Sequence, residues 1–401
     1  MVGETACCAN RWIIIPCKRP ARHPKSSCNT DQVSYLLAFA GFAALVILHE
    51  FGHFTAAKAV GMRVERFSLF FPPLIARVRR GETEYAIGAV PLGGYVKITG
   101  MNPNERIPPE IADRAYFRQP VWKRVVVIAA GPFMNFLIAF VIIWVLLLSL
   151  GQVRNALVVN FVDKGTPAAG QLQKGDRILS IDGRPGYAPG LSAKETTDRQ
   201  TRLRAVVARH TCAGPMRDGC TATTPATVVV DRGGKQVTLH IRPRYNAAAK
   251  AMLLGIGYGQ NIDIPPGRAA SLTVSQMWGV TKATVGGIVK IFYNPEARKQ
   301  VSGVVGSFEV TRETIAFDTT RALYILALIS LSLAVVNLFP FLPLDGGHIF
   351  WALAEKVRGR PIPFAVMERA SVVGFMLVAI LFVIGLTNDI GRLAGDGFNV
   401  R

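Results

Sequence analysis

The chain has 401 residues, half of them hydrophobic, and its formal net charge at pH 7 is +20. Its mean hydropathy is positive, which excludes an ordinary soluble globular domain. Four apolar stretches approach or exceed the roughly 20 residues that a helix needs to cross a bilayer, and the fourth is short but free of charge. They are Val33–Ala59, Val125–Leu150, Ala322–Leu344 and Ser371–Leu386. The sequence therefore predicts a polytopic α-helical membrane protein with about four transmembrane helices.

The basic residues gather in the two loops that follow the first and third stretches, between Arg63 and Arg124 and between Lys356 and Arg360. Because Lys and Arg concentrate in the cytoplasmic loops of membrane proteins, both loops are predicted to be cytoplasmic. Both termini and the segment 151–321 are then predicted to lie outside. No basic stripe with interleaved aromatic residues is present, so the charge indicates contact with the lipid bilayer and no nucleic-acid partner.

Residues 1–32 conflict with this topology, because they are basic and rich in cysteine yet would lie outside. They lack the apolar core and small-residue cleavage site of a signal peptide. We expect an unstructured or mis-annotated extension, with the functional chain beginning near Val33. The alternative is a metal site at Cys7, Cys8, Cys17 and Cys28, but their spacings match no standard zinc knuckle.

The first apolar stretch contains the segment His49-Glu50-Phe51-Gly52-His53, which has the form H-E-x-x-H. On a helix, residues i and i+4 share a face, so both imidazoles can bind one metal ion, with Glu50 beside them as general base. The alternative is a pair of structural histidines, but polar side chains at membrane depth are usually functional. The segment therefore predicts two zinc ligands and the residue that activates water.

The loop after this stretch predicts β-structure. Residues 76–100 alternate apolar and polar side chains around the turn Arg79-Arg80-Gly81-Glu82, which is typical of a β-hairpin followed by a further strand. An edge strand at this position could pair with an extended substrate segment through backbone groups.

The long segment after the second stretch contains a strand-and-turn pattern at Gly165–Pro185 and a hairpin pattern at Ala226–Tyr245. The first resembles PDZ domains, which bind C-terminal tails by strand addition; the alternative is a purely structural plug. Cys212 and Cys220 flank a turn-rich loop and could form a disulfide. Between residues 274 and 292, apolar side chains recur at helical spacing, which predicts an amphipathic helix at the outer leaflet.

The third stretch offers a further ligand. A catalytic zinc ion binds three protein ligands and keeps one position open. The segment from Asn337 to His348 contains Pro340 and Pro343, which break a helix where irregular backbone can line a cavity enclosed by protein. Asp345 follows these prolines and is the predicted third ligand, with His348 as the alternative.

These motifs together resemble the site-2 protease family of intramembrane zinc metalloproteases. The resemblance is to the type of the bacterial regulator of sigma-E protease, in a version with a single PDZ domain. It rests on H-E-x-x-H in the first span, N-x-x-P-x-x-P-L-D-G in the third, the PDZ-like insert, and two family signatures at Gly93–Met101 and Ala130–Asn135. The chain departs from the family at Leu69 and Phe71, which replace glycines, and at Val304, which replaces proline.

The resemblance implies that His49, His53 and Asp345 hold one zinc ion per chain, and that Glu50 is the general base and later the proton donor. It also implies that Asn337 binds the substrate backbone or the oxyanion, as a side-chain amide near a metal ion can do. The alternative for Asn337 is a cap at the helix break.

Four residues are assigned to substrate binding: Asn135, Gly93, Gly94 and Tyr95. Asn135 lies in a Gly-Pro break of the second span. Its alternative roles there are helix packing and substrate gating.

The expected function is regulated intramembrane proteolysis in a bacterial inner membrane. The substrate would be a single-span membrane protein such as an anti-sigma factor, cut after another protease has trimmed its exterior. The active site would face the cytoplasmic side, and the PDZ-like domain would filter substrates on the extracytoplasmic side. The alternatives are a PDZ scaffold without catalysis and a membrane-anchored zinc peptidase that acts on soluble substrates. The expected domains are the extension 1–32, a first membrane half 33–150, the PDZ-like domain 151–246, a linker 247–320 and a second membrane half 321–401.

Overall fold

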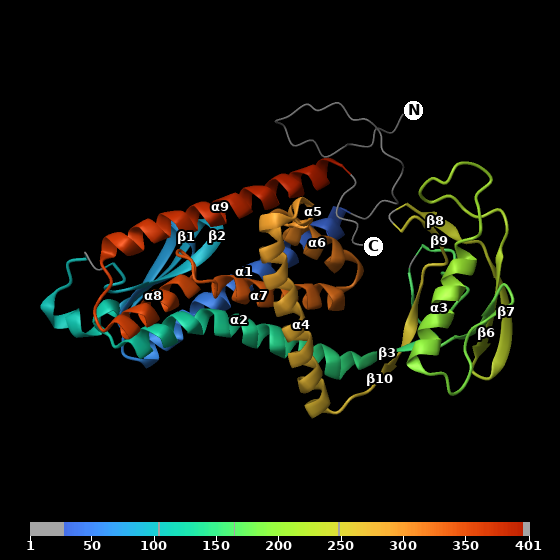
Figure 1. Ribbon diagram of the computed structural model, residues 1–401, viewed down its shortest axis with the longest axis horizontal. Helices are drawn as coiled ribbons and strands as arrows, with labels where there is room; N and C mark the ends of the chain where they lie inside the picture. The colour runs from blue at the N-terminus through green and yellow to red at the C-terminus, as the bar shows by residue number, and fades with distance from the viewer. Residues whose placement is uncertain (1–27, 103–104, 164, 248, 396–401) are drawn as a thin grey trace, which may run out of the picture.

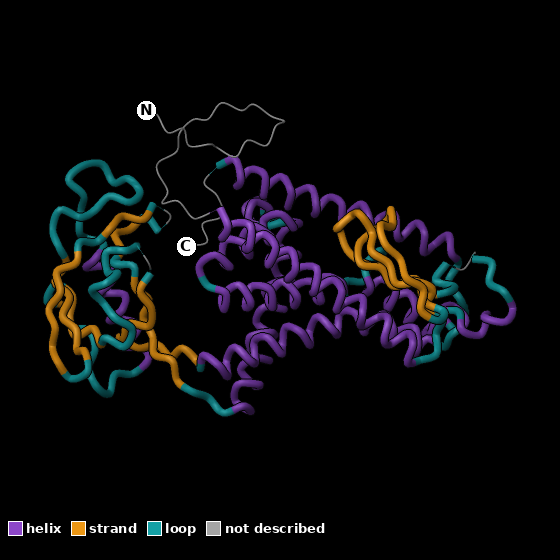
Figure 2. The backbone as a smooth tube through the Cα atoms, turned by 180° about the vertical axis from the view of Figure 1, so that it is seen from behind, coloured by secondary structure: helices purple, strands orange, loops and turns teal. Residues whose placement is uncertain are grey.

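The computed structural model describes residues 28–102, 105–163, 165–247 and 249–395. Helices fill one part of the elongated molecule, and a separate sheet domain lies at the other end of its long axis (Figures 1 and 2). Most of the predicted extension, residues 1–27, lies outside the described residues. The first helix, α1 (Cys28–Ala59), begins within that extension and continues into the first apolar stretch.

Within the described residues, four helices are long and apolar enough to span a membrane, as predicted. They are α1, α2 (Val121–Leu150), α7 (Thr319–Asn337) and α9 (Phe364–Ala394). The third ends at Asn337 rather than at the predicted Leu344. The reason is local, because Pro340 and Pro343 provide no backbone N–H for a continuing helix.

Glycines allow α1 and α2 to approach closely. A Cβ atom on Gly52 would lie 2.3 Å from the carbonyl oxygen of Ala130, and one on Gly131 would lie 2.2 Å from Nε2 of His53. Small residues at such crossings are how membrane helices bring their backbones together. Further along its length, α2 packs on α7 through a buried apolar cluster that includes Ala139, Ile143, Ala327 and Leu331.

Strands β1 (Val64–Arg80) and β2 (Thr83–Ile98) form an antiparallel sheet that joins α1 to α2. Arg66 pairs with both Glu84 and Lys97, so the first part of β1 lies between the two parts of β2. The last part of β2, from Gly93 to Ile98, is therefore an edge of this sheet. The predicted hairpin turn is present between Arg80 and Thr83. At the turn, Glu82 accepts hydrogen bonds from Arg114 and Lys58.

Two short 3-10 helices, η1 (Pro109–Arg114) and η2 (Tyr116–Arg118), lead from this sheet to α2. Tyr116 is buried there with Met62, Val64 and Ile98 in a cluster that joins the sheet to α1.

The inserted domain (residues 152–262) is a sheet with the strand order β10-β3-β4-β6-β7 and one helix. Its elements are β3 (Gln152–Val162), β4 (Arg177–Ile181), β5 (Arg184–Pro185), α3 (Ala193–Val207), β6 (Ala226–Arg232), β7 (Lys235–Ile241) and β10 (Ile256–Ile262). Alternate residues of β6 are buried, and they pack with Leu203 and Val207 of α3. Because β10 pairs with β3, the sheet extends beyond the end predicted at residue 246. The glycine-rich sequence of β10 shows little of the alternation that marks a strand.

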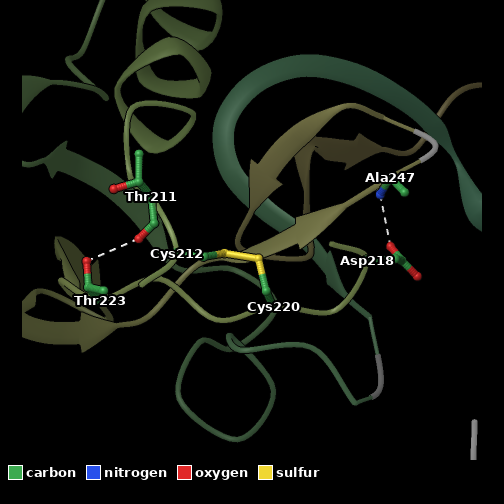
Figure 3. Close-up of a disulfide and its surroundings, with 6 residues drawn as sticks. All are labelled: Thr211, Cys212, Asp218, Cys220, Thr223 and Ala247. Carbon is green, nitrogen blue, oxygen red and sulfur yellow. Dashed lines mark hydrogen bonds between the residues drawn. A yellow bond between two sulfur atoms is a disulfide. The ribbon is translucent and has the colours of Figure 1, made fainter. Parts of the chain in front are cut away.

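A disulfide joins Cys212 to Cys220, as the flanking loop suggested. Figure 3 shows the bridge together with two hydrogen bonds, from Thr223 to the carbonyl oxygen of Thr211 and from the backbone of Ala247 to Asp218. The nearby hairpin of β8 (Arg244–Asn246) and β9 (Ala251–Leu253) pairs with this loop through Arg244.

The connection between the helices and the inserted domain is short at both ends. The chain leaves α2 at Leu150 and returns to α4 (Pro266–Tyr293) directly after β10. Gln152 pairs with Ile262, and the side-chain amide of Asn261 donates to the carbonyl oxygen of Leu150. A Cβ atom on Gly151 would lie 2.5 Å from the carbonyl oxygen of Ile262, so a glycine is required at this point.

The remaining helices are α5 (Pro295–Gln300), α6 (Val304–Phe317) and α8 (Asp345–Arg358). Helix α4 covers the predicted amphipathic segment and crosses α2 and α7 in Figure 1. Asp389 of α9 is fully buried and accepts backbone hydrogen bonds from Gly303 and Gly306, which attaches α9 to the start of α6.

Candidate metal centre

The three predicted metal ligands come from two helices that meet inside the helical part. His49 and His53 lie one turn apart on α1, and both are buried. Asp345 begins α8, directly after the loop that contains Pro340 and Pro343. A Cβ atom on Gly346, the next residue, would lie 2.2 Å from the carbonyl oxygen of Leu338. The glycine therefore lets α8 start against the end of α7.

The ligand atoms form a nearly equilateral triangle. Nε2 of His49 lies 3.3 Å from Nε2 of His53 and 3.3 Å from Oδ2 of Asp345. Nε2 of His53 lies 3.4 Å from the same oxygen. Three ligands at about 2.0–2.1 Å from a tetrahedral zinc ion lie about 3.3–3.4 Å from one another. The spacing of these atoms therefore fits a single zinc ion.

The aspartate supports the same conclusion. Oδ2 of Asp345 is buried and has no hydrogen-bond partner among the described residues. A buried carboxylate oxygen without such a partner is costly unless a charge or a metal ion compensates it. His348, the alternative ligand, is not a member of this cluster within the described part of the chain. It lines a small cavity with Tyr116 and Arg124 instead.

Both imidazoles have a second partner on α2. Nδ1 of His53 lies 2.9 Å from the carbonyl oxygen of Val127, which can only accept a hydrogen bond. Nδ1 of His53 is therefore protonated, and in the neutral ring its Nε2 carries a lone pair directed at the triangle. Nδ1 of His49 lies 3.1 Å from the side-chain amide of Asn135.

The edge strand of β2 passes next to Glu50. A Cβ atom on Gly94 would lie 2.8 Å from Cγ of Glu50 and 3.0 Å from the carbonyl oxygen of Ser68. The neighbouring Tyr95 stacks on Phe71, and its hydroxyl accepts a hydrogen bond from Arg66. The segment Gly93–Tyr95, predicted to bind substrate, thus passes next to Glu50, and Gly94 makes room for that side chain.

Asn337, the last residue of α7, also lies near the three predicted metal ligands. Its Nδ2 atom lies 3.5 Å from Nε2 of His49, so its amide reaches the same region as the ligand atoms. The break in the third span thus positions both Asn337 and Asp345.

Sequence reasoning missed the anchor of α8. The guanidinium of Arg124, on α2, donates two hydrogen bonds of 2.9 and 2.7 Å to the carboxylate of Glu355, on α8. Arg124 is only 3% exposed, and the bidentate geometry fixes the helix that carries Asp345. By its charge and position in the sequence, Arg124 belongs with the basic residues of the loop. Its position at the start of the apolar span was the one available signal.

Comparison with known proteins gives a consistent result. The model of Peptidase family M50 matches residues 37–381. A relative from Rhizobium meliloti, named "putative zinc metalloprotease", is 31% identical over 376 residues, which cover 88% of this chain and 94% of the relative. One of the same description from Nostoc is 30% identical and covers 88% and 93%. The zinc metalloprotease Rip1 of Mycobacterium bovis is 29% identical and covers 78% and 83%.

Proposed function

The chain belongs to peptidase family M50, and from this premise we propose that it is an intramembrane zinc endopeptidase whose substrate is a single-span membrane protein. The observation that carries the proposal is the triangle of ligand atoms from His49, His53 and Asp345. Its two histidines lie on a helix apolar enough to span a bilayer. At 1.5 Å per residue, His49 lies roughly 15 Å from the end of that helix. This depth falls inside a hydrocarbon core of about 30 Å.

In this proposal His49, His53 and Asp345 hold one zinc ion per chain. When bound there, zinc lowers the pKa of water and polarises the scissile carbonyl group. The aspartate contributes a negative charge to a site that would otherwise consist of two neutral imidazoles. Its helix is held by the ion pair of buried Arg124 with half-buried Glu355.

Glu50 is the proton carrier. It follows His49 directly and lies beside the edge strand at Gly94, so its carboxylate can accept a proton from the attacking water. It then delivers this proton to the leaving amine, which restores the carboxylate. Asn337 is suited to donate a hydrogen bond to the oxyanion that develops on the carbonyl oxygen, because its amide lies near His49.

The substrate would bind along the edge of β2. A peptide bond inside a helix is shielded by the helix's own hydrogen bonds, so the substrate must unwind before attack. The free backbone groups of the segment Gly93–Tyr95 can pair with an unwound chain. This pairing would bring the extended substrate next to Glu50.

The basic loops also bear on how the chain is oriented in its membrane. The basic loops suggest that the β1–β2 sheet faces the cytoplasm of a bacterium and that the inserted domain is extracytoplasmic. We propose that the inserted domain is PDZ-like and admits only substrates whose external part another protease has removed. A bacterial anti-sigma factor fits this substrate class.

The test uses the purified chain in proteoliposomes with a single-span helical substrate. Glu50→Gln should retain zinc but lose cleavage by at least about 100-fold, which is the usual contribution of a general base. Glu110→Gln, at an exposed glutamate, is the control and should cleave normally. Cleavage by Glu50→Gln at the control rate would refute the mechanism.

The same preparation separates the alternatives. Mass spectrometry of the products should place the cut within or near the membrane helix. Equal cleavage of a soluble unstructured peptide would instead favour a membrane-anchored peptidase with soluble substrates. Absence of cleavage by the zinc-loaded wild type would favour a scaffold.

A further inference from the structure

The side chain of Asn135 is fully buried, whereas a residue that binds substrate must be accessible to it. It lies on α2, and none of its surface is exposed. Its backbone carbonyl oxygen accepts a hydrogen bond of 3.1 Å from Ser330 of α7, one contact among those that pack this turn of α2 on the third span. Its side-chain amide faces Nδ1 of His49 at 3.1 Å. Its Oδ1 atom is buried and has no hydrogen-bond partner in the part of the chain that the structure describes.

The chemistry of His49 decides which amide atom must face the ring. Nε2 of His49 is the atom in the ligand triangle, and it can bind a metal ion only through its lone pair. A neutral imidazole carries one N–H group, so Nδ1 must then be the protonated nitrogen. Only an oxygen can accept that hydrogen. The oxygen and nitrogen of an amide exchange places on rotation by 180° and are assigned from their partners.

We propose that Asn135 is the positioning residue for His49, with Oδ1 accepting a hydrogen bond from Nδ1–H. This contact holds the ring in the tautomer that presents the Nε2 lone pair to the metal position. The carbonyl oxygen of Val127 has the same role for His53. The two ligands of α1 are thus oriented by two acceptors on α2, one from a side chain and one from the backbone. Such outer partners raise the basicity of ligating imidazoles and hold their orientation.

The proposal replaces substrate binding as the role of Asn135. A substrate chain would have to displace α2 or α7 to reach its amide, because the side chain is enclosed and its backbone is bound to Ser330. The proposal rests on the proposed function, because it presupposes that His49 binds the metal ion.

Three variants of the full chain in detergent test the proposal by zinc affinity, measured in competition with a chelator. Asn135→Leu keeps the volume but removes the acceptor, and its affinity should fall by about 10–100-fold. Asn135→Asp keeps an acceptor and has no amide donor, so its affinity should stay within about threefold of the wild type. Ser330→Ala is the matched control, because it removes the backbone hydrogen bond of the same residue but leaves the amide untouched, and it should bind zinc normally.

His49→Ala is measured in parallel to distinguish a failure of the role of Asn135 from a failure of the metal site itself. If it loses zinc while Asn135→Leu binds as the wild type does, the role of Asn135 is refuted and the metal site stands. If Asn135→Asp loses as much affinity as Asn135→Leu, the amide donor is what matters and the proposal is also refuted. If His49→Ala binds zinc normally, the metal site itself is refuted, and the role of Asn135 with it.

Discussion

Replacing Gly131 by alanine tests the geometry of the metal centre without changing any ligand. The added Cβ atom would lie 2.2 Å from Nε2 and 2.5 Å from Cε1 of His53. An ordinary contact between such atoms begins near 3.4 Å, so the imidazole must move by about 1 Å or α1 and α2 must separate. Metal–ligand distances tolerate changes of about 0.2 Å. His53 therefore cannot keep its place in a triangle with sides of 3.3 and 3.4 Å.

We expect Gly131→Ala to weaken zinc binding and to slow cleavage by at least about 100-fold, since a displacement of about 1 Å in an active site costs about that factor in rate. Zinc affinity by chelator competition and cleavage of a helical substrate in proteoliposomes are the two measurements. The fold should persist, because alanine favours a helix over glycine by roughly 0.5–1 kcal/mol.

Gly286→Ala on α4 is the matched control. No described heavy atom lies within 4 Å of a Cβ atom at Gly286, so this variant should bind zinc and cleave as the wild type does. Wild-type zinc affinity in Gly131→Ala would show that His53 is not held where the structure has it, and the reasoning from the ligand triangle would be refuted.

Two further predictions concern the β1–β2 sheet. Gly94→Ala should retain zinc but cleave about 10-fold more slowly, because its Cβ atom would contact Cγ of Glu50 and shift the base; an unchanged kcat would contradict the placement of this strand. Hydrogen bonds from Arg114 and Lys58 lower the pKa of Glu82 from 4.5 to about 2, so the stability they contribute is complete above pH 4.5 and is lost as the pH falls towards 2. The difference in melting temperature between the wild type and Glu82→Gln should accordingly be constant from pH 7 to 5 and shrink below pH 4.5, and a difference that does not change with pH would argue against the ion pair.

The three residues that the structure brings together as a candidate metal centre could be predicted from the sequence, because their arrangement depends on local spacing. His49 and His53 share a helix face through the i, i+4 interval, and the prolines before Asp345 mark where a span must break. The same reasoning placed the hairpin of β1 and β2, since alternation and a Gly81 turn are local signals.

Contacts between segments far apart in the chain were not predictable in this way. The pairing of β10 with β3 joins residues about a hundred positions apart and leaves no periodic pattern in the glycine-rich strand. The contact of Asn135 with His49 and the pair of Arg124 with Glu355 depend on how α2 crosses its neighbours. A single sequence does not specify that crossing.

The paired strands at residues 152–154 and 260–262 also bear on how this architecture can change. They hold the C-terminal end of α2 next to the N-terminal end of α4, independently of the structure that the chain forms between these strands. Extra loops, a second copy of the module or an unrelated module could be accommodated there without moving His49, His53 or Asp345. The inserted domain can therefore vary in size and kind while the arrangement of the three predicted metal ligands stays constant.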